Sequence, residues 1–211
     1  LNAASNQLSH YPSRPSGMSD ELYELGYSGT SSSNIAMTSW RSSLLKSLKM
    51  WMDDSDSSNI DRLGHRRWIL NPTMQQTGFG YAVSNSGAAY SSVYVFDYDY
   101  HNTDVTGVAW PATEMPKRYF ESSSAWSYSY GSSLNGNVSV KLQCLTTGRE
   151  RTWNFSSAAS DGYFNVDNGG YGQKGCVIFK PDSISLQAGE DYEVTITQDG
   201  TVIADYTVHF F

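Results

Sequence analysis

Residues 59–81, NIDRLGHRRWILNPTMQQTGFGY, say more about the fold than any other stretch of this sequence. They predict a short basic helix that carries one histidine, His65, and ends at Asn71-Pro72. Proline has no N–H to donate inside a helix and pushes the residue before it toward extended geometry, so the helix must stop there. Residues 77–81, TGFGY, then alternate small and large side chains, which is typical of a strand crowded on one face. His65 is therefore expected near a helix end and beside a strand, where a pocket can form.

Two upstream segments occur in a matching order. Residues 8–12, LSHYP, contain another histidine, His10, and residues 32–36 read SSNIA. In order and spacing, the three segments resemble the signatures of the CAP superfamily (the SCP, PR-1 and antigen 5 proteins). The bacterial form of that family reads roughly S-x-x-H-R-x-x-I-L-x-P, then G-x-G, around its second histidine, and usually has G-E-N-I-A in the central segment. The resemblance covers about residues 1–110, and three ordered segments are more specific than one pattern match.

The resemblance implies a CAP-type α/β/α sandwich with a cleft that contains two histidines and two carboxylates. It assigns His10 and His65 to this cleft, with their imidazole nitrogens within about 8 Å of each other, close enough for one metal ion or water to bridge. It also puts Asn34 in the place of the first family glutamate. The second glutamate often follows a helix tryptophan by three residues, and the matching position here is Asp54.

Two imidazoles and a carboxylate are a reasonable ligand set for zinc or another divalent ion. Because Asn34 offers only a neutral oxygen, we expect His10 and His65 to bind such an ion weakly. Binding should fade below about pH 6, because free imidazoles take up protons near pH 6.5.

Each candidate residue also has a structural alternative. His65 could cap or pack its helix, and Asn34 could be a helix N-cap. Asp54 lies in the polar run DDSD (residues 53–56), which favours a solvated loop acid over a ligand, and the neighbouring acids Asp53 and Asp56 compete for the same role.

The first 70 residues show helical periodicity. One apolar stripe predicts a helix of about 18 residues, capped by Ser33 or Asn34; its members are Met37, Trp40, Leu44, Leu48 and Trp51. A shorter helix is predicted to begin after Ser19 and to end at Gly26. Residues 78–83 and 90–98 are predicted to form a hairpin through the turn at residues 84–87.

The pattern of the second half is different and predicts an α+β chain in three parts. These are a CAP/SCP-like domain over residues 1–110 with a truncated first helix, a connector over 111–132, and a small antiparallel immunoglobulin-like β-sandwich over 133–211. The sandwich is predicted from six short strands: residues 138–145, 151–155, 163–166, 176–180, 192–198 and 202–211. Its two cysteines, Cys144 and Cys176, fit either a disulfide or two buried thiols. No motif there carries chemistry, which favours a packing or spacer module.

Composition restricts the possible partners. The chain has 211 residues, with 14 Lys and Arg against 21 Asp and Glu, a net charge of −7. Phosphate contacts need a basic patch, so the composition argues against nucleic acid. The densest basic cluster, Arg62, Arg66 and Arg67, is predicted to be one helix face. No apolar run reaches the ~20 residues of a membrane span. Because the chain opens at Leu1 without methionine, a signal peptide is expected upstream, and with it an extracellular or cell-surface location.

The resemblance implies a binding role outside the cell, with a small molecule, a lipid, or a peptide or cell-wall ligand in the cleft. The alternative is a metal-dependent hydrolase of peptides or cell-wall material, in which His65 is a metal ligand or a base. A third interpretation is surface adhesion through the C-terminal module. No G-x-S-x-G motif or ordered Ser-His-Asp set supports a serine nucleophile, so we assign no catalytic residue.

Overall fold

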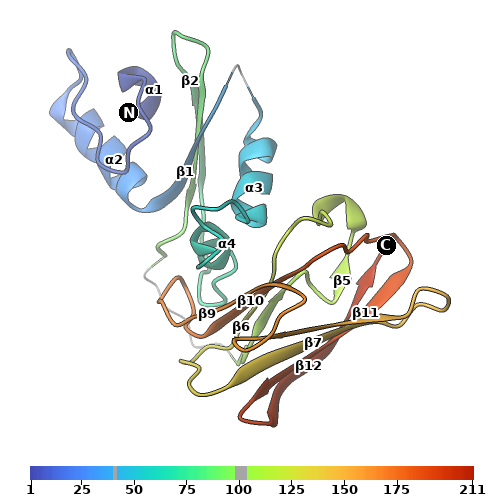
Figure 1. Cartoon of the computed structure of the whole chain (residues 1–211). Helices are drawn as coiled ribbons and strands as arrows, with labels where there is room; N and C mark the ends of the chain where they lie inside the picture. Colours follow the sequence, from blue (N-terminus) through green and yellow to red (C-terminus); the bar gives the residue numbers. More distant parts are fainter. Residues whose placement is uncertain (40–41, 98–103) are drawn as a thin grey trace. The chain divides into compact units, whose positions relative to one another are not determined.

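The computed structural model describes residues 1–39, 42–97 and 104–211, which form a mixed α+β protein (Figure 1). The chain falls into two compact units: Leu1–Met52 with Asn71–Thr103, and Asp53–Leu70 with Asp104–Phe211. We call them the N-terminal unit and the C-terminal unit. Among the described residues, the N-terminal unit contains one three-stranded sheet and the C-terminal unit contains two larger ones.

The N-terminal sheet has β3 (Ala89–Tyr94) at its centre, between β1 (Ser33–Thr38) and β2 (Phe79–Val83). Both pairings are antiparallel, and the predicted hairpin of β2 and β3 is confirmed. Its turn is closed by the backbone N–H of Ser84, which donates to the carbonyl of Ala88 at 2.8 Å. The second strand ends at Tyr94, earlier than predicted, and residue 98 lies outside the described residues.

The predicted 18-residue helix is wrong in its first half. Residues 33–38 form β1, and helix α3 spans only Leu44–Asp53. Six residues of β1 pair with β3, and this ladder outweighs the helical spacing because tertiary context overrides local propensity. Trp51 keeps its place on the buried face of α3, where its indole N–H donates to the carbonyl of Ile35 at 3.3 Å. Residue 40 lies outside the described part of the chain.

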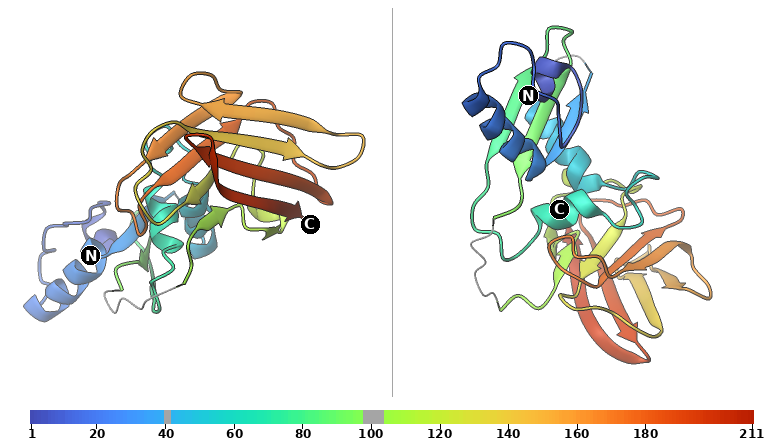
Figure 2. Two further views of the ribbon diagram at one scale, coloured as in Figure 1. Left: turned by 90° about the horizontal axis from the view of Figure 1, so that it is seen from below. Right: turned by 90° about the vertical axis from the view of Figure 1, so that its left-hand side faces the viewer.

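Helices α1 (Asn2–Ser5) and α2 (Asp20–Ser31) contact β3 and β1 respectively, and Figure 2 shows α2 in blue beside the strands. Helix α2 begins as predicted, because the Ser19 hydroxyl accepts a hydrogen bond from Leu22 N at 3.3 Å. It continues past Gly26, where it was predicted to end. A Cβ on Gly26 would lie 2.7 Å from Leu1 Cγ, so this glycine permits close packing of α1 instead of ending the helix.

The C-terminal unit contains two sheets with the strand orders β4-β6-β10-β9 and β5-β12-β11-β7-β8. All six strands predicted after residue 133 are confirmed: β7 (Val138–Cys144), β8 (Arg151–Ser156), β9 (Gly162–Asp167), β10 (Cys176–Pro181), β11 (Glu190–Gln198) and β12 (Thr201–Phe210). The alternation read from the sequence matches burial, since Val138, Val140, Leu142 and Cys144 of β7 all face the interior.

The predicted connector is wrong, because it is built into these sheets. It contains β5 (Glu114–Met115), the 3₁₀ helix η1 (Lys117–Tyr119) and β6 (Trp126–Ser129), and β4 (Val108–Trp110) lies just before it. Strands of two to four residues are too short to show a period, so only their pairing partners define them. The compact units therefore do not follow the limits predicted at residues 110 and 132.

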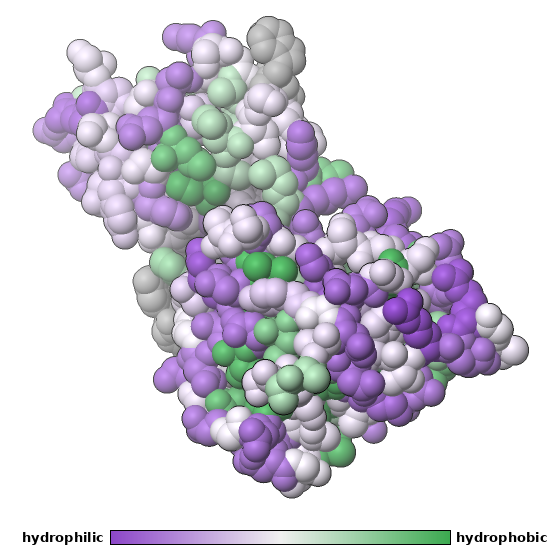
Figure 3. Space-filling view, in the orientation of Figure 1, coloured by the Kyte–Doolittle hydropathy of each residue, from purple (hydrophilic) through white to green (hydrophobic). Residues whose placement is uncertain are grey.

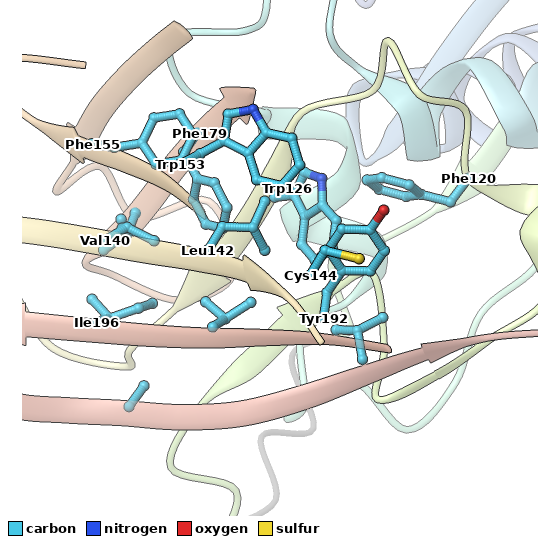
Figure 4. Close-up of a cluster of buried hydrophobic side chains, with 14 of the residues drawn as sticks. Phe120, Trp126, Val140, Leu142, Cys144, Trp153, Phe155, Phe179, Tyr192 and Ile196 are labelled. Carbon is cyan, nitrogen blue, oxygen red and sulfur yellow. The ribbon is translucent and has the colours of Figure 1, made fainter. Parts of the chain in front are cut away.

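One hydrophobic core fills the space between the two C-terminal sheets (Figure 4). Trp126 of β6 is fully buried among aromatic rings from both sheets, with centroid distances of 5.9 Å to Phe179, 5.8 Å to Tyr192 and 5.8 Å to Phe210. Such contacts between rings add to the energy of area burial. The core also contains Cys144, which is an unbonded thiol, as is the buried Cys176.

The face of the molecule seen in Figure 3 is mostly hydrophilic or neutral, with hydrophobic residues in smaller groups. Within the described residues, no helix is long and apolar enough to cross a membrane.

Substituting Phe179 with alanine should lower the unfolding free energy of the C-terminal unit by about 3–5 kcal/mol. The side chain is completely buried, and its ring centroid lies 5.2 Å from that of Phe155, so truncation leaves a cavity between the sheets. Denaturant unfolding followed by near-ultraviolet circular dichroism measures the loss. Val202→Ala is the control, because Val202 is 55% exposed and should change stability by no more than about 0.5 kcal/mol. Equal losses for the two variants would contradict the packing described here.

Candidate functional site

The four residues proposed for the cleft are divided between the two compact units. His10 and Asn34 belong to the N-terminal unit, whereas Asp54 and His65 belong to the C-terminal unit. We describe each pair within its own unit, and the separation of about 8 Å predicted for His10 and His65 stays a prediction.

Helix α4 (Gly64–Ile69) carries His65 and confirms the short basic helix read from the sequence. Its C-cap is Leu70, immediately before the Asn71-Pro72 stop signal. The preceding residue, Leu63, has the left-handed φ of 49°, which turns the chain sharply into the helix. A Cβ on Gly64 would lie 3.1 Å from the ring of Tyr171, so glycine allows this aromatic side chain to pack at the start of the helix.

Asp54 is the residue that organises this helix. Its side chain is only 2% exposed, so the expectation of a solvated loop acid is wrong. One carboxylate oxygen accepts hydrogen bonds from the backbone N–H groups of His65, at 2.9 Å, and Arg66, at 3.3 Å. These N–H groups at the start of a helix have no partner within it, and a carboxylate there is also favoured by the helix dipole. Asp54 therefore caps α4 from ten residues upstream.

The second carboxylate oxygen of Asp54 contacts the His65 ring, with 2.8 Å to Nδ1. Because an ionised carboxylate can only accept, this contact places the proton of a neutral ring on Nδ1. A ligand or metal would then bind through Nε2, and the His65 side chain is 31% exposed. A carboxylate behind a histidine in this way fixes its tautomer and holds the ring in one orientation.

The neighbouring acids have other roles. Asp56 accepts hydrogen bonds from Ser58 and Asn59, which lower the pKa of its carboxyl group, and it shapes the turn before α4. The backbone carbonyl of Asp53 accepts a hydrogen bond from the guanidinium of Arg66. The contacts described for these two acids are with other groups, so Asp54 is the acid that the structure associates with the His65 ring.

Arg66 is completely buried, contrary to the single basic helix face predicted for Arg62, Arg66 and Arg67. Its guanidinium donates to the carbonyl of Ala125 at 2.8 Å and to the hydroxyl of Ser127 at 3.1 Å. Burial lowers the pKa of Arg66 to about 10, while the negative charge of Asp54 opposes that shift. Arg66 therefore stays protonated at neutral pH and ties α4 to β6.

Arg67 forms a second set of contacts that anchor α4. Its guanidinium pairs with the carboxylate of Asp167 and donates to the carbonyls of Gly169 and Gln173, each at 2.6 Å. It also lies 5.2 Å from the centre of the Tyr171 ring, within range of a cation–π contact. Consecutive helical residues point about 100° apart, so Arg66 and Arg67 reach different partners from α4. That angle and the low charge content of the chain are the two sequence features that could have indicated the burial of Arg66 and Arg67.

His10 lies on an exposed loop of the N-terminal unit. Its Nδ1 is 3.0 Å from the carbonyl oxygen of Thr30, near the end of α2. A carbonyl oxygen only accepts, so here too the ring carries its proton on Nδ1 and would bind a ligand through Nε2. His10 and His65 thus use their rings in the same way, although they belong to different units.

Asn34 is buried in β1, at 4% exposure, and pairs with Val93. It is not a helix N-cap. Matched letter by letter, residues 32–36 put the glutamate of G-E-N-I-A at Ser33 and its asparagine at Asn34. The assignment of the lost carboxylate to Asn34 is therefore shifted by one residue. In a strand this shift matters, because Ser33 and Asn34 point to opposite faces of the sheet.

Within the described residues, no three His, Cys, Asp or Glu side chains lie close enough together to hold a metal ion. Both carboxylate oxygens of Asp54 already accept hydrogen bonds from α4, so this acid supports His65 rather than acting as a direct ligand.

Replacing Arg66 with methionine should lower the stability of the C-terminal unit by about 3–5 kcal/mol. The change leaves the buried Asp54 carboxylate without its neighbouring cation and leaves Ala125 O and Ser127 without their donor. Chemical denaturation measures the difference. Arg62→Met is the matched control, because the partly exposed guanidinium of Arg62 contacts Asp61 and Asn59 near the surface and not a buried carboxylate. If both variants unfold at the same denaturant concentration, the buried contacts contribute nothing.

One protein family matches this chain. The model of CAP, the cysteine-rich secretory protein family, matches residues 2–98. No curated protein matches the chain significantly. The matched region includes the segments of His10, β1 and α4 on which the sequence resemblance rests. Residues 2–98 are therefore similar to the CAP family, and the similarity extends over slightly less than half of the chain.

Proposed function

We propose that this chain is a CAP-domain protein that acts outside the cell or at its surface, and that His65 is the centre of a site for a ligand or a weakly bound divalent metal. The contact between Asp54 and His65 carries the proposal. A buried carboxylate that holds an imidazole by Nδ1 is a recurring support for histidines that bind metals or accept protons through Nε2.

The residues present fit a weak metal site better than a strong one. His65 would supply Nε2, water would supply further ligands, and the family resemblance adds His10 to the set. An ion there would act as a Lewis acid on a bound ligand. Two neutral imidazoles leave most of the metal charge uncompensated, which limits the affinity.

Zinc titration by calorimetry tests this proposal. We expect weak binding to the wild-type chain, loss of binding in His65→Ala, and binding weakened by about tenfold in Asp54→Asn, because a carboxylate that holds a ligating histidine typically contributes about 10–100-fold to metal affinity. His209→Ala is a matched control, since His209 also contacts a carboxylate, that of Asp191 at 2.7 Å, on the surface. If His65→Ala binds zinc as well as wild type does, His65 is not the centre of the site.

A second test restores the missing carboxylate. Ser33→Glu should tighten zinc binding by about 1–3 kcal/mol, because a charged ligand replaces a neutral group. Asn34→Glu should leave zinc binding unchanged, because the side chain at position 34 lies on the opposite face of β1. Ser33→Gln, which adds a side chain of the same size without the charge, is the control. The reverse result, with tighter binding only in Asn34→Glu, would restore the original assignment of the glutamate to Asn34.

A metal-dependent hydrolase of peptide or cell-wall material is the second candidate, because the Asp54–His65 contact would also orient a general base. The discriminating experiment is incubation with purified peptidoglycan and with casein, with and without zinc. Release of soluble fragments by wild type, and none by His65→Ala, would favour the hydrolase. Binding without release would favour the ligand-binding role.

We also propose that the C-terminal sheets form an immunoglobulin-like module. The order of the first sheet, β4-β6-β10-β9, corresponds to the A-B-E-D arrangement of that fold. In the second sheet, the run β12-β11-β7-β8 corresponds to G-F-C-C′, and β5 lies at its edge beside β12. Secretion and a bacterial type of CAP protein belong to the same proposal, supported by the family match and by the Ser- and Tyr-rich, acidic composition. Cell fractionation of the native host is the direct test of location.

A further inference from the structure

A groove of about 430 Å³ lies on the C-terminal unit between residues 105–113, which include β4, and residues 204–206 of β12. Its volume lies in the range of ligand sites, and its lining is largely apolar. The residues that matter for the argument are Gly107, Ala112, Thr113, Tyr128, Asp205 and Tyr206. All of them lie in the C-terminal unit, and none belongs to the His65 site.

Two stacked tyrosines line this groove. The rings of Tyr128 and Tyr206 are 5.6 Å apart with an angle of 22° between their planes. The Tyr206 hydroxyl is buried and has no hydrogen-bond partner among the described residues. Gly107 allows the chain to approach the pair, since a Cβ there would lie 2.0 Å from the Tyr128 hydroxyl. An unsatisfied buried hydroxyl beside a groove is a group that a ligand can satisfy.

The groove also runs along an open strand edge. β12 pairs with β11 over its full length, but β5 covers its other side only at His209 and Phe210. The N–H of His209 donates toward that side, to Thr113 O at 2.7 Å. Because backbone groups alternate along a strand, the N–H and C=O groups of Asp205 and Thr207 point to the same side, where no described strand pairs with them.

The side chains of β12 indicate which kind of peptide strand could pair with its open edge. Tyr206 points inward, whereas Asp205 is exposed and points to the outer face of the sheet. A strand added beside β12 would alternate in the same way, with one set of side chains over the tyrosines and the next set beside Asp205. Asp205 is also the one charged residue that lines the groove in the described structure. The inward set should therefore be apolar or aromatic, and the outward set basic.

We propose that this groove binds an extended peptide segment, with alternating basic and apolar residues, that adds as a strand to the outer edge of β12. Main-chain hydrogen bonds to Asp205 and Thr207 supply affinity, and the pocket over Tyr128 and Tyr206 supplies selection of an aromatic or apolar side chain. An acceptor on the bound segment reaches the Tyr206 hydroxyl.

The test uses the whole chain and a synthetic peptide of about seven residues, acetylated and amidated, in which lysine alternates with valine and tyrosine. Fluorescence anisotropy measures binding, and NMR chemical-shift changes locate it. We expect saturable binding with the largest shifts at Asp205 and Thr207. The same peptide with N-methyl groups on alternate backbone nitrogens keeps its charge but cannot pair as a strand, so it should bind at least about tenfold more weakly.

Variants of the protein separate edge pairing from charge attraction. Thr207→Pro removes an edge N–H at a position where an edge strand tolerates proline, and should weaken binding by about tenfold or more. Asp205→Lys should weaken it by about tenfold, whereas Glu150→Lys, the same charge change at an exposed residue elsewhere, should stay within about twofold. Equal binding of the N-methylated peptide, or failure of the unmodified peptide to bind wild type, overturns the proposal.

Discussion

The Asp54 carboxylate holds the candidate site together. It caps α4 through two backbone N–H groups, fixes the His65 ring through Nδ1, and provides negative charge near the buried guanidinium of Arg66. These three roles depend on one another. An arginine can be buried here because a carboxylate is close, and the carboxylate can be buried because α4 satisfies both of its oxygens. Removing either charge leaves the other buried without compensation.

This arrangement changes the role of the C-terminal half. Its sequence indicated a spacer, but β6 and the loop after β9 supply the carbonyls and hydroxyl that anchor Arg66 and Arg67. The segment of residues 53–70 lies within the stretch matched by the CAP family, yet it is part of the compact C-terminal unit. The helix that carries His65 is therefore anchored by groups more than 50 residues further along the chain, which the CAP signatures do not include.

Local sequence signals predicted some elements well, for identifiable physical reasons. The Ser19 cap, the Asn71-Pro72 stop and the alternating strands after residue 133 depend on backbone chemistry and on a regular apolar period. The region of β1 was misread because its apolar spacing also suits a helix, and a long-range ladder with β3 decided the outcome. β4, β5 and β6 were missed because such short strands have no period of their own.

The sequence alone determined that His65 sits on a short helix with a defined end, that two histidine segments and SSNIA occur in the CAP order, and that the last third of the chain is β-structure. Those features follow from local geometry and from the order of residues. Only the tertiary structure decided that Asp54 is buried against His65, that Arg66 and Arg67 are interior, and that Ser33 and Asn34 lie on opposite faces of a strand. Burial and pairing depend on which distant segments approach, and a single sequence does not encode that in any local pattern.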